Sequence, residues 1–307
     1  MQLGLKLDVD TLRGTRAGVP ALVEALGAAG ADATFLFSLG PDHTGRAIRR
    51  VFRPGFLGKV SRTSVVSHYG IRSLLYGTLL PGPDIGRRAA DDMRAARAAG
   101  FEVGVHCHDH TLWQDFVAQR DKAWTARQMQ LAIDSFVRIF GERPRTHGAA
   151  GWQMNDHAFR LEDELGFDYA SDTRGEAPFI AVVDGEEIRC PQLPTTLPTL
   201  DELIGVDGVT EASAAEALLR LTAVPRPGHV FTLHAEIEGL RLLPVFRQLL
   251  AGWRRQGYRL VSLRTQWQGL DRESLPRCAV SSGTRPGRSG TLAVQGPPRA
   301  TAPVACA

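Results

Sequence analysis

The sequence has few cysteines, no long apolar run and little net charge. Its 4 cysteines are scattered without CxxC spacing, so neither a disulfide framework nor a zinc ribbon is predicted. No run approaches the roughly 18 apolar residues of a membrane span, and no signal-peptide pattern precedes Asp8, so we expect a cytoplasmic protein. A net charge of +3 does not argue for nucleic acid, and no nucleic-acid module is recognisable.

What the sequence does contain is a regular alternation of short apolar runs and amphipathic stretches. Such β–α alternation predicts a parallel sheet, open or closed into a barrel. The predicted strands are residues 3–8, 33–38, 101–105, 169–171, 187–193, 230–234 and 259–262, and the predicted helices are 19–29, 85–99, 125–140, 155–165 and 242–256.

Two segments interrupt this pattern. One is an insertion at residues 41–83, between the second strand and the next helix, and the other is the tail 271–307. The tail is rich in Ser, Gly, Pro and Arg without periodicity, so it is predicted to be mostly disordered. Residues 1–270 are then one α/β domain carrying the insertion.

Two aspartates follow the first apolar run, and two histidines follow a later one. Asp8 and Asp10 are two residues apart at the end of a strand, so their carboxylates point to the same place. The run 103–105 ends at His106 and His110. One carboxylate with two imidazoles is a common ligand set for a divalent metal that keeps positions open for water. The second carboxylate is then free to accept a proton, which predicts a metal-assisted hydrolase.

Each of these residues also has a structural alternative. Strand-end aspartates often cap a helix or a turn, and a pair of histidines four residues apart is ambiguous alone. His108 is expected to point away from the metal, and Cys107 to be a packing residue. The order of the residues favours the metal, because barrel enzymes build their sites at the C-terminal ends of strands. The residues predicted to lie there are Asp8, Asp10, His106, His110, Asp172 and His234.

Other candidates follow later strands. His234 is predicted to be a general acid rather than a core histidine, with Asp172 or Glu236 orienting its ring; Asp172 alternatively caps a turn or contacts substrate. The turn 148–152 contains small residues that permit close approach of a ligand. Its backbone N–H groups, near Gly151 and Trp152, are candidate oxyanion donors, although a simple βα turn explains the same pattern.

The insertion 41–83 combines cations with large apolar residues, and its only acid is Asp42. This combination suits an anionic membrane surface or a lipid that carries a phosphate. The basic residues assigned to this patch are Arg49, Arg50, Arg53, Lys59 and Arg62.

The order of these motifs resembles that of the polysaccharide deacetylases of the NodB type, carbohydrate esterase family 4. Within that superfamily the chain is most similar to the lipid-linked formamido-arabinose deformylases. The stretches that carry the resemblance are residues 8–20, 37–42, 149–152, 171–175, 193–199 and 234–239, and it extends over about residues 1–270.

The resemblance implies a deformed (β/α) barrel of about seven strands and a divalent metal, which the ligand types do not identify among zinc, manganese and cobalt. It implies that Asp10, His106 and His110 hold the metal and that Asp8 is the base. The implied reaction removes the formyl group from formamido-arabinose linked through phosphate to undecaprenol. Such a reaction serves lipid A modification and resistance to cationic peptides such as polymyxin.

The resemblance also implies which residues contact the substrate and where the protein acts, and the chain departs from it at one motif. Candidate contacts to the sugar or its phosphate are Arg13, Arg16 and Arg174, because guanidinium groups suit bidentate phosphate contact. The protein is expected on the cytoplasmic side of the inner membrane, bound peripherally. The arginine that the wider superfamily has at its third motif is absent, since Ala149–Trp152 occupies that place. The alternatives are a deacetylase of another N-acyl sugar and a catalytically weak lipid-phosphate binding protein.

Overall fold

The computed structural model describes residues 1–47, 71–224 and 226–299. Arg49, Arg50, Arg53, Lys59 and Arg62 lie outside the described residues. The strands are β1 (Gln2–Val9), β2 (Thr34–Ser38), β3 (Glu102–Cys107), β4 (Thr146–His147), β5 (Tyr169–Ala170), β6 (Ile180–Val183), β7 (Glu186–Glu187), β8 (His229–His234), β9 (Arg259–Val261), β10 (Arg277–Gly283) and β11 (Leu292–Pro298).

Helices alternate with most of these strands, as predicted. The α-helices are α1 (Val19–Ala29), α4 (Ile71–Leu75), α5 (Ile85–Arg88), α6 (Ala90–Ala98), α7 (His110–Phe116), α8 (Lys122–Phe140), α9 (Asp156–Leu165), α10 (Leu200–Leu203), α11 (Glu211–Leu221), α12 (Leu243–Arg255) and α13 (Leu263–Gln268). Short η segments are η1 (Gly14–Gly18), η3 (Val117–Gln119) and η4 (Ala150–Trp152). None of the described helices is long and apolar enough to cross a bilayer.

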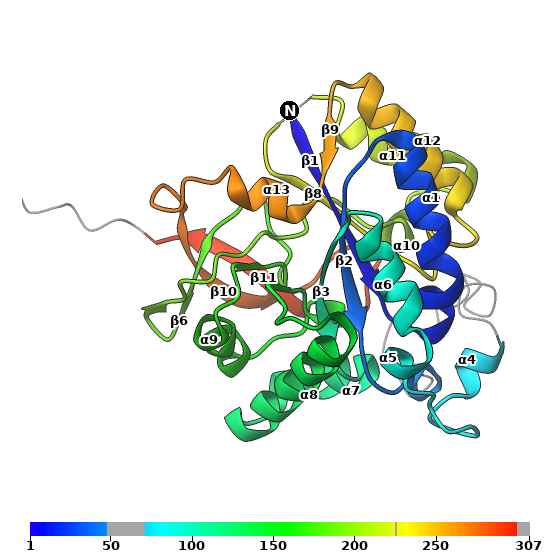
Figure 1. Cartoon of the computed structure of the whole chain (residues 1–307). Helices are drawn as coiled ribbons and strands as arrows, with labels where there is room; N and C mark the ends of the chain where they lie inside the picture. The colour runs from blue at the N-terminus through cyan, green and yellow to red at the C-terminus, as the bar shows by residue number, and fades with distance from the viewer. Residues whose placement is uncertain (48–70, 225, 300–307) are drawn as a thin grey trace, which may run out of the picture.

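The main sheet is parallel and has the order β5-β4-β3-β2-β1-β8, with β9 also paired to β1. β1 pairs with three strands, β2, β8 and β9. Its residues from Leu3 to Val9 are all buried, as expected for a parallel sheet covered on both faces. Helices α1, α6, α11 and α12 lie along one side of it, and α7 and α8 lie near the C-terminal end of β3 (Figure 1). The curled sheet is the deformed (β/α) barrel that the resemblance implied.

An irregular segment, residues 191–197, lies between the two edges of this sheet. The Leu193 N–H donates to Ala170 O in β5 at 2.8 Å, and the Thr196 N–H donates to Val230 O in β8 at 3.1 Å. The predicted strand at 187–193 is therefore wrong, because only Glu186–Glu187 forms a strand there. Pro191 and Pro194 lack the N–H that a regular ladder needs.

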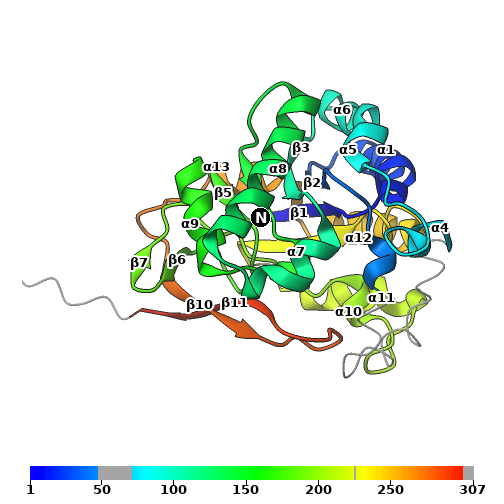
Figure 2. The same ribbon diagram turned by 90° about the horizontal axis from the view of Figure 1, so that it is seen from below.

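The predicted disorder of the tail is also wrong for residues 277–298. β10 and β11 form an antiparallel hairpin, and β10 adds in parallel to β6, so a second sheet lies beside the barrel (Figure 2). Cys278 and Leu292 are buried in it. Local periodicity missed these strands because their partner, β6, lies about a hundred residues earlier in the chain.

Candidate active site

β1 delivers both aspartates to the C-terminal edge of the sheet. Asp8 lies in register with His234 of β8 on one side and with Leu36 of β2 on the other. Asp10 follows the strand, where the Asp10 N–H (3.0 Å) and the Thr11 N–H (2.7 Å) both donate to Oε1 of Glu236. Glu236 therefore holds the backbone that carries Asp10.

Asp10, His106 and His110 form the cluster that the sequence predicted. Asp10 Oδ1 lies 3.3 Å from His106 Nε2, and Asp10 Oδ2 lies 3.4 Å from His110 Nε2. One atom from each of the three residues lies within 4.8 Å of the others. Tetrahedral ligands about 2.05 Å from a zinc ion are about 3.3 Å apart, so the spacing fits a metal held between them.

Hydrogen bonds outside the cluster orient its members. His106 donates from Nδ1 to the carbonyl oxygen of Gly148, which leaves Nε2 facing Asp10, as a metal ligand requires. His110 is the first residue of α7, which Asp109 caps by accepting from the Leu112 N–H. Burial opposes ionisation of Asp10, but His110 and His106 outweigh it and hold the pKa of Asp10 below its ordinary value. The Asp10 carboxylate is therefore ionised, and the His106 ring is oriented towards it.

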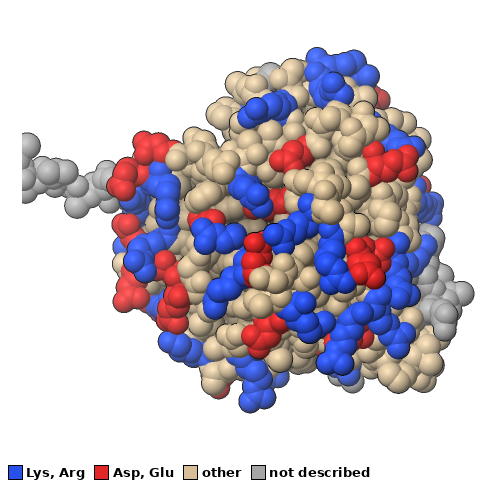
Figure 3. Space-filling view, in the orientation of Figure 1, with Lys and Arg blue, Asp and Glu red and all other residues tan. Residues whose placement is uncertain are grey.

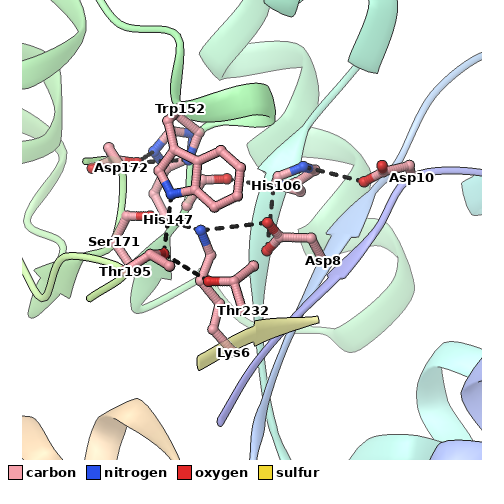
Figure 4. Close-up of polar contacts among 12 residues, drawn as sticks. Lys6, Asp8, Asp10, His106, His147, Trp152, Ser171, Asp172, Thr195 and Thr232 are labelled. Carbon is pink, nitrogen blue, oxygen red and sulfur yellow. Dashed lines mark hydrogen bonds and ion pairs between the residues drawn. The ribbon is translucent and has the colours of Figure 1, made fainter. Parts of the chain in front are cut away.

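Asp8 stands beside this cluster and contacts a buried lysine (Figure 4). Lys6 Nζ lies 3.4 Å from Asp8 Oδ2 and donates to the carbonyl oxygen of Ser171 at 2.8 Å. Its ammonium also lies over the Trp152 ring, 5.2 Å from the centroid. Asp8 Oδ1 is buried without a hydrogen-bond partner among the described residues. Asp8 is thus an acceptor with one oxygen held and the other unused.

Lys6 was missed by the sequence analysis, although a signal existed. It is the one cation in the apolar run Leu3–Leu7 and lies two residues before Asp8, so the strand period puts both side chains on one face. Lysine is almost never fully buried without a partner. Lys6 is a cation beside Asp8, the candidate base, in a chain that lacks the arginine of the third motif.

His234 ends β8, and its ring centroid lies 6.4 Å from that of Trp152. Its backbone N–H donates to Glu238 Oε2 at 2.7 Å, and its Nδ1 is buried with no hydrogen-bond partner in the described chain. The prediction that Asp172 or Glu236 orients this ring is wrong. Both carboxylates accept hydrogen bonds from backbone N–H groups elsewhere, Asp172 from Ala149 and Glu236 from Asp10 and Thr11.

Asp172 belongs to a second, fully buried cluster. Its Oδ1 accepts from the Ala149 N–H at 2.7 Å and lies 2.8 Å from His147 Nδ1. His147 Nδ1 is also 2.8 Å from Glu162 Oε1, and Gln192 donates to both carboxylates. Spacings of 2.8 Å are those of hydrogen bonds. Asp172 therefore anchors the turn 148–152 and does not contact the candidate acid.

The turn 148–152 is sharply bent at Gly151 (φ 62°) and Trp152 (φ 54°). The Ala149 N–H is used by Asp172, and the Trp152 N–H donates to the Ala149 carbonyl. Neither is available to an oxyanion, so the candidate donors narrow to Ala150 and Gly151. The Trp152 side chain donates from Nε1 to Thr195 Oγ1, which fixes the ring between Lys6 and His234.

The predicted substrate arginines are in different settings. Arg174 is buried, pairs with both oxygens of Glu202 and stacks 5.0 Å from the Trp152 centroid. Arg16 donates to the Arg88 carbonyl, and Arg13 directly precedes η1. As predicted, Cys107 is buried against Ser38, and His108 lies against Gly40, away from the cluster.

Comparison with known proteins identifies the chain. No protein-family model matches it. It is 38% identical over 253 residues (81% of this chain, 80% of the relative) to a probable 4-deoxy-4-formamido-L-arabinose-phosphoundecaprenol deformylase ArnD of Shewanella sediminis. The chain belongs to the ArnD deformylase family. The ArnD-named protein of Wigglesworthia glossinidia brevipalpis is 30% identical over 92% of this chain and 98% of its own length. The chain is therefore a hydrolase that acts on an amide bond.

Solved structures agree on the fold. A polysaccharide deacetylase structure from Mycobacterium smegmatis, described as putative, superposes with a TM-score of 0.60 at 16% identity, covering 93% of this chain and 96% of that one. One described as a probable polysaccharide deacetylase from Pseudomonas aeruginosa gives 0.58 at 16% identity, covering 87% and 89%. The ArnD family member thus has the NodB-type deacetylase fold.

Proposed function

We propose that the protein hydrolyses the N-formyl group of 4-deoxy-4-formamido-L-arabinose linked through phosphate to undecaprenol. The products are formate and the free amino sugar, whose cationic amine would later cancel phosphate charge on lipid A and weaken the binding of cationic peptides such as polymyxin. The carrying observation is the pair formed by the Asp10–His106–His110 cluster and the adjacent, partly unpaired Asp8. Relatives named for this deformylation supply the substrate class.

Asp10, His106 and His110 fit a divalent metal by spacing, donor type and the orientation of His106. When bound, such an ion supplies a Lewis acid that polarises the formyl oxygen and lowers the pKa of water from about 15.7 towards about 7. These donors suit zinc, manganese and cobalt alike.

The chain's own residues supply the proton transfers. Asp8 accepts the proton of the attacking water at its unpartnered Oδ1, while Lys6 holds the other oxygen in place. The N–H groups of Ala150 and Gly151 are the donors assigned to the developing oxyanion, where one such donor contributes about 3 kcal/mol. His234, across the β1–β8 pair from Asp8, donates a proton to the departing amine. Its Nδ1 has no carboxylate partner among the described side chains, so Trp152 packing orients the ring.

We further propose that the protein acts at the cytoplasmic surface of the inner membrane. The basic insertion 41–83 carries the argument from sequence, since cations and apolar side chains together favour an anionic lipid surface. Basic side chains are prominent around α5 and α6 in Figure 3, beside a group of acidic side chains on the same part of this face, and Asp91 and Asp92 lie in the first turn of α6. Arg87 and Arg88 lie in the last turn of α5.

Mass spectrometry of the lipid-linked sugar before and after incubation with metal-loaded protein tests the proposal. We expect loss of the formyl group and release of formate. The N-acetyl counterpart should react more slowly; preferential loss of acetyl would instead identify a deacetylase. No hydrolysis of either compound, with tight binding of the lipid, would favour a lipid-phosphate binding protein.

A further inference from the structure

The loop between β10 and β11, residues 284–291, brings two arginines to the side of the candidate active site. The hairpin is attached there by backbone hydrogen bonds from Arg174 N–H to Ala293 O (2.9 Å) and from Gln295 N–H to Arg174 O (2.8 Å). At the loop's tip, Gly287 lies so close to the Glu202 backbone that a Cβ would be 2.1 Å from the carbonyl oxygen. The loop is therefore seated on the start of α10.

Two guanidinium groups contact one carboxylate here, and the charge of a third, that of Arg285, acts on Arg174. Arg174 pairs with both oxygens of Glu202, and Arg288 lies 3.5 Å from the same carboxylate. Burial lowers the pKa of Arg174, and the charges of Arg288 and Arg285 add to this effect. Glu202 neutralises one of the three charges, so the cluster has a surplus of positive charge.

Donors in this cluster are also unused. The Nε atoms of Arg174 and Arg285 are buried and have no hydrogen-bond partner among the described residues. Arg174 as a whole is 4% exposed. A buried donor without a partner costs about 1–3 kcal/mol, and a guanidinium group pairs most strongly with a planar or tetrahedral oxyanion. An anion would satisfy both the charge and the donors.

The cluster adjoins the reaction site through one side chain. Arg288 lies 4.5 Å and Arg174 5.0 Å from the Trp152 centroid, and the same ring packs against His234 and Lys6. A ligand that reached from the candidate acid to the arginines would need to extend only past the Trp152 ring. A sugar with a phosphate at its far end has that form.

We propose that Arg285 and Arg288, with Arg174, bind the phosphodiester oxyanion of the substrate. This assignment rests on the proposed function and sharpens it. The C-terminal hairpin thereby becomes part of the substrate site, and the enzyme distinguishes a phosphate-linked sugar from a neutral N-formyl sugar. Arg174 keeps its structural pairing with Glu202, and the two loop arginines provide the selective contact.

The test compares two substrates in metal-loaded wild type and in the double variant R285Q/R288Q. One substrate is the sugar joined by a phosphodiester to a short, water-soluble prenyl chain, and the other is the methyl glycoside of the same formamido sugar. We expect the ratio of kcat/KM for the phosphodiester over the glycoside to fall roughly 10- to 100-fold. The matched control is R299Q at the far end of the hairpin, where Arg299 contacts Gly185; its ratio should equal that of wild type.

Competition by inorganic phosphate separates this inference from the proposed function. We measure binding by calorimetry on equally metal-loaded proteins at constant ionic strength, so that any phosphate held by the metal contributes equally. Weaker phosphate binding in R285Q/R288Q supports the anion site even if neither formyl compound is hydrolysed, which would overturn the proposed function alone. Should the double variant misfold, Arg288→Lys keeps the charge but loses the fork and should lower the ratio by a smaller factor. Equal loss on both substrates, or unchanged phosphate binding, would overturn the inference.

Discussion

The protein contains two clusters of histidine and carboxylate side chains, and they differ in spacing and in access. In the Asp10–His106–His110 cluster the contacting atoms lie 3.3 and 3.4 Å apart, and the His110 side chain is 19% exposed. In the His147–Glu162–Asp172 cluster they lie 2.8 Å apart, and every member is buried. The first cluster, called the open cluster below, leaves room for a metal ion between its ligand atoms. In the second, called the closed cluster, the shorter distances are those of hydrogen bonds, so a proton lies between the atoms.

This difference shows that residue type alone does not identify a metal site. Both clusters meet the compositional requirement, but in one the His106 Nδ1–H donates to a backbone carbonyl and its Nε2 is presented to the ligand position. In the other, His147 uses Nδ1 for both carboxylates, and Gln192 occupies their remaining oxygens. The open cluster can exchange a ligand with solvent, whereas the closed cluster stabilises the turn that carries Trp152.

The largest expected effect follows from removing one ligand of the open cluster. His110→Ala should lose the bound metal, and deformylation should fall to background, because two ligands cannot hold the ion against water. His147→Gln should keep a full complement of metal. Elemental analysis of the purified variants, with activity measured on the same samples, makes the comparison. Retention of metal by the first variant, or its loss from the second, would exchange the roles of the clusters.

The next effect separates the proposed base from the proposed metal ligands. Asp8→Asn should lower kcat about 10²- to 10⁴-fold, the usual contribution of a general base. Its metal content should match that of wild type, because Asp8 is the carboxylate that the cluster does not use. Persistent deformylation after this change would show that another group accepts the proton.

A smaller effect concerns how each cluster balances its charge. The closed cluster has its own histidine between two carboxylates, but Asp8 relies on Lys6, a cation from the same strand. Lys6→Met should lower kcat about 10- to 100-fold while KM changes little, since the ammonium positions the base and is not placed on the substrate. Metal content and circular dichroism serve as controls. A change confined to KM would instead place Lys6 on the substrate.

Much of the candidate site could be predicted from sequence, because its residues follow strands of β-α units whose C-terminal ends share one edge. Strand periodicity and that rule were enough to predict that five residues lie near one another: Asp8, Asp10, His106, His110 and His234. Lys6 was also readable, but a single lysine in an apolar run was passed over.

The rest depended on long-range contacts that no local pattern records. The prediction that Asp172 or Glu236 orients His234 was wrong because each carboxylate has several polar groups within reach. Both accept hydrogen bonds from backbone N–H groups instead. The hairpin of β10 and β11 failed for a related reason, since its strands are stabilised by pairing with β6 rather than by their own apolar content. The loop that carries Arg285 and Arg288 is held in place by that pairing and by the backbone hydrogen bonds between the hairpin and Arg174.

The smallest expected effect tests the closed cluster through pH. Burial opposes protonation of His147, but Asp172 and Glu162 outweigh it and raise its pKa to about 10, against about 6.5 in the unfolded chain. The stabilisation is therefore complete below about pH 6.5 and is lost as pH rises towards 10. Burial and the charge of Asp172 raise the pKa of Glu162, so the cost of ionising Glu162 in the folded protein also lowers the stability as pH rises. In urea unfolding between pH 6 and 10, wild type should lose stability more steeply than His147→Gln, with unchanged m-values. A constant difference in the free energy of unfolding across that range would mean that His147 is not charged in the native state, and the closed cluster would then be held by hydrogen bonds alone.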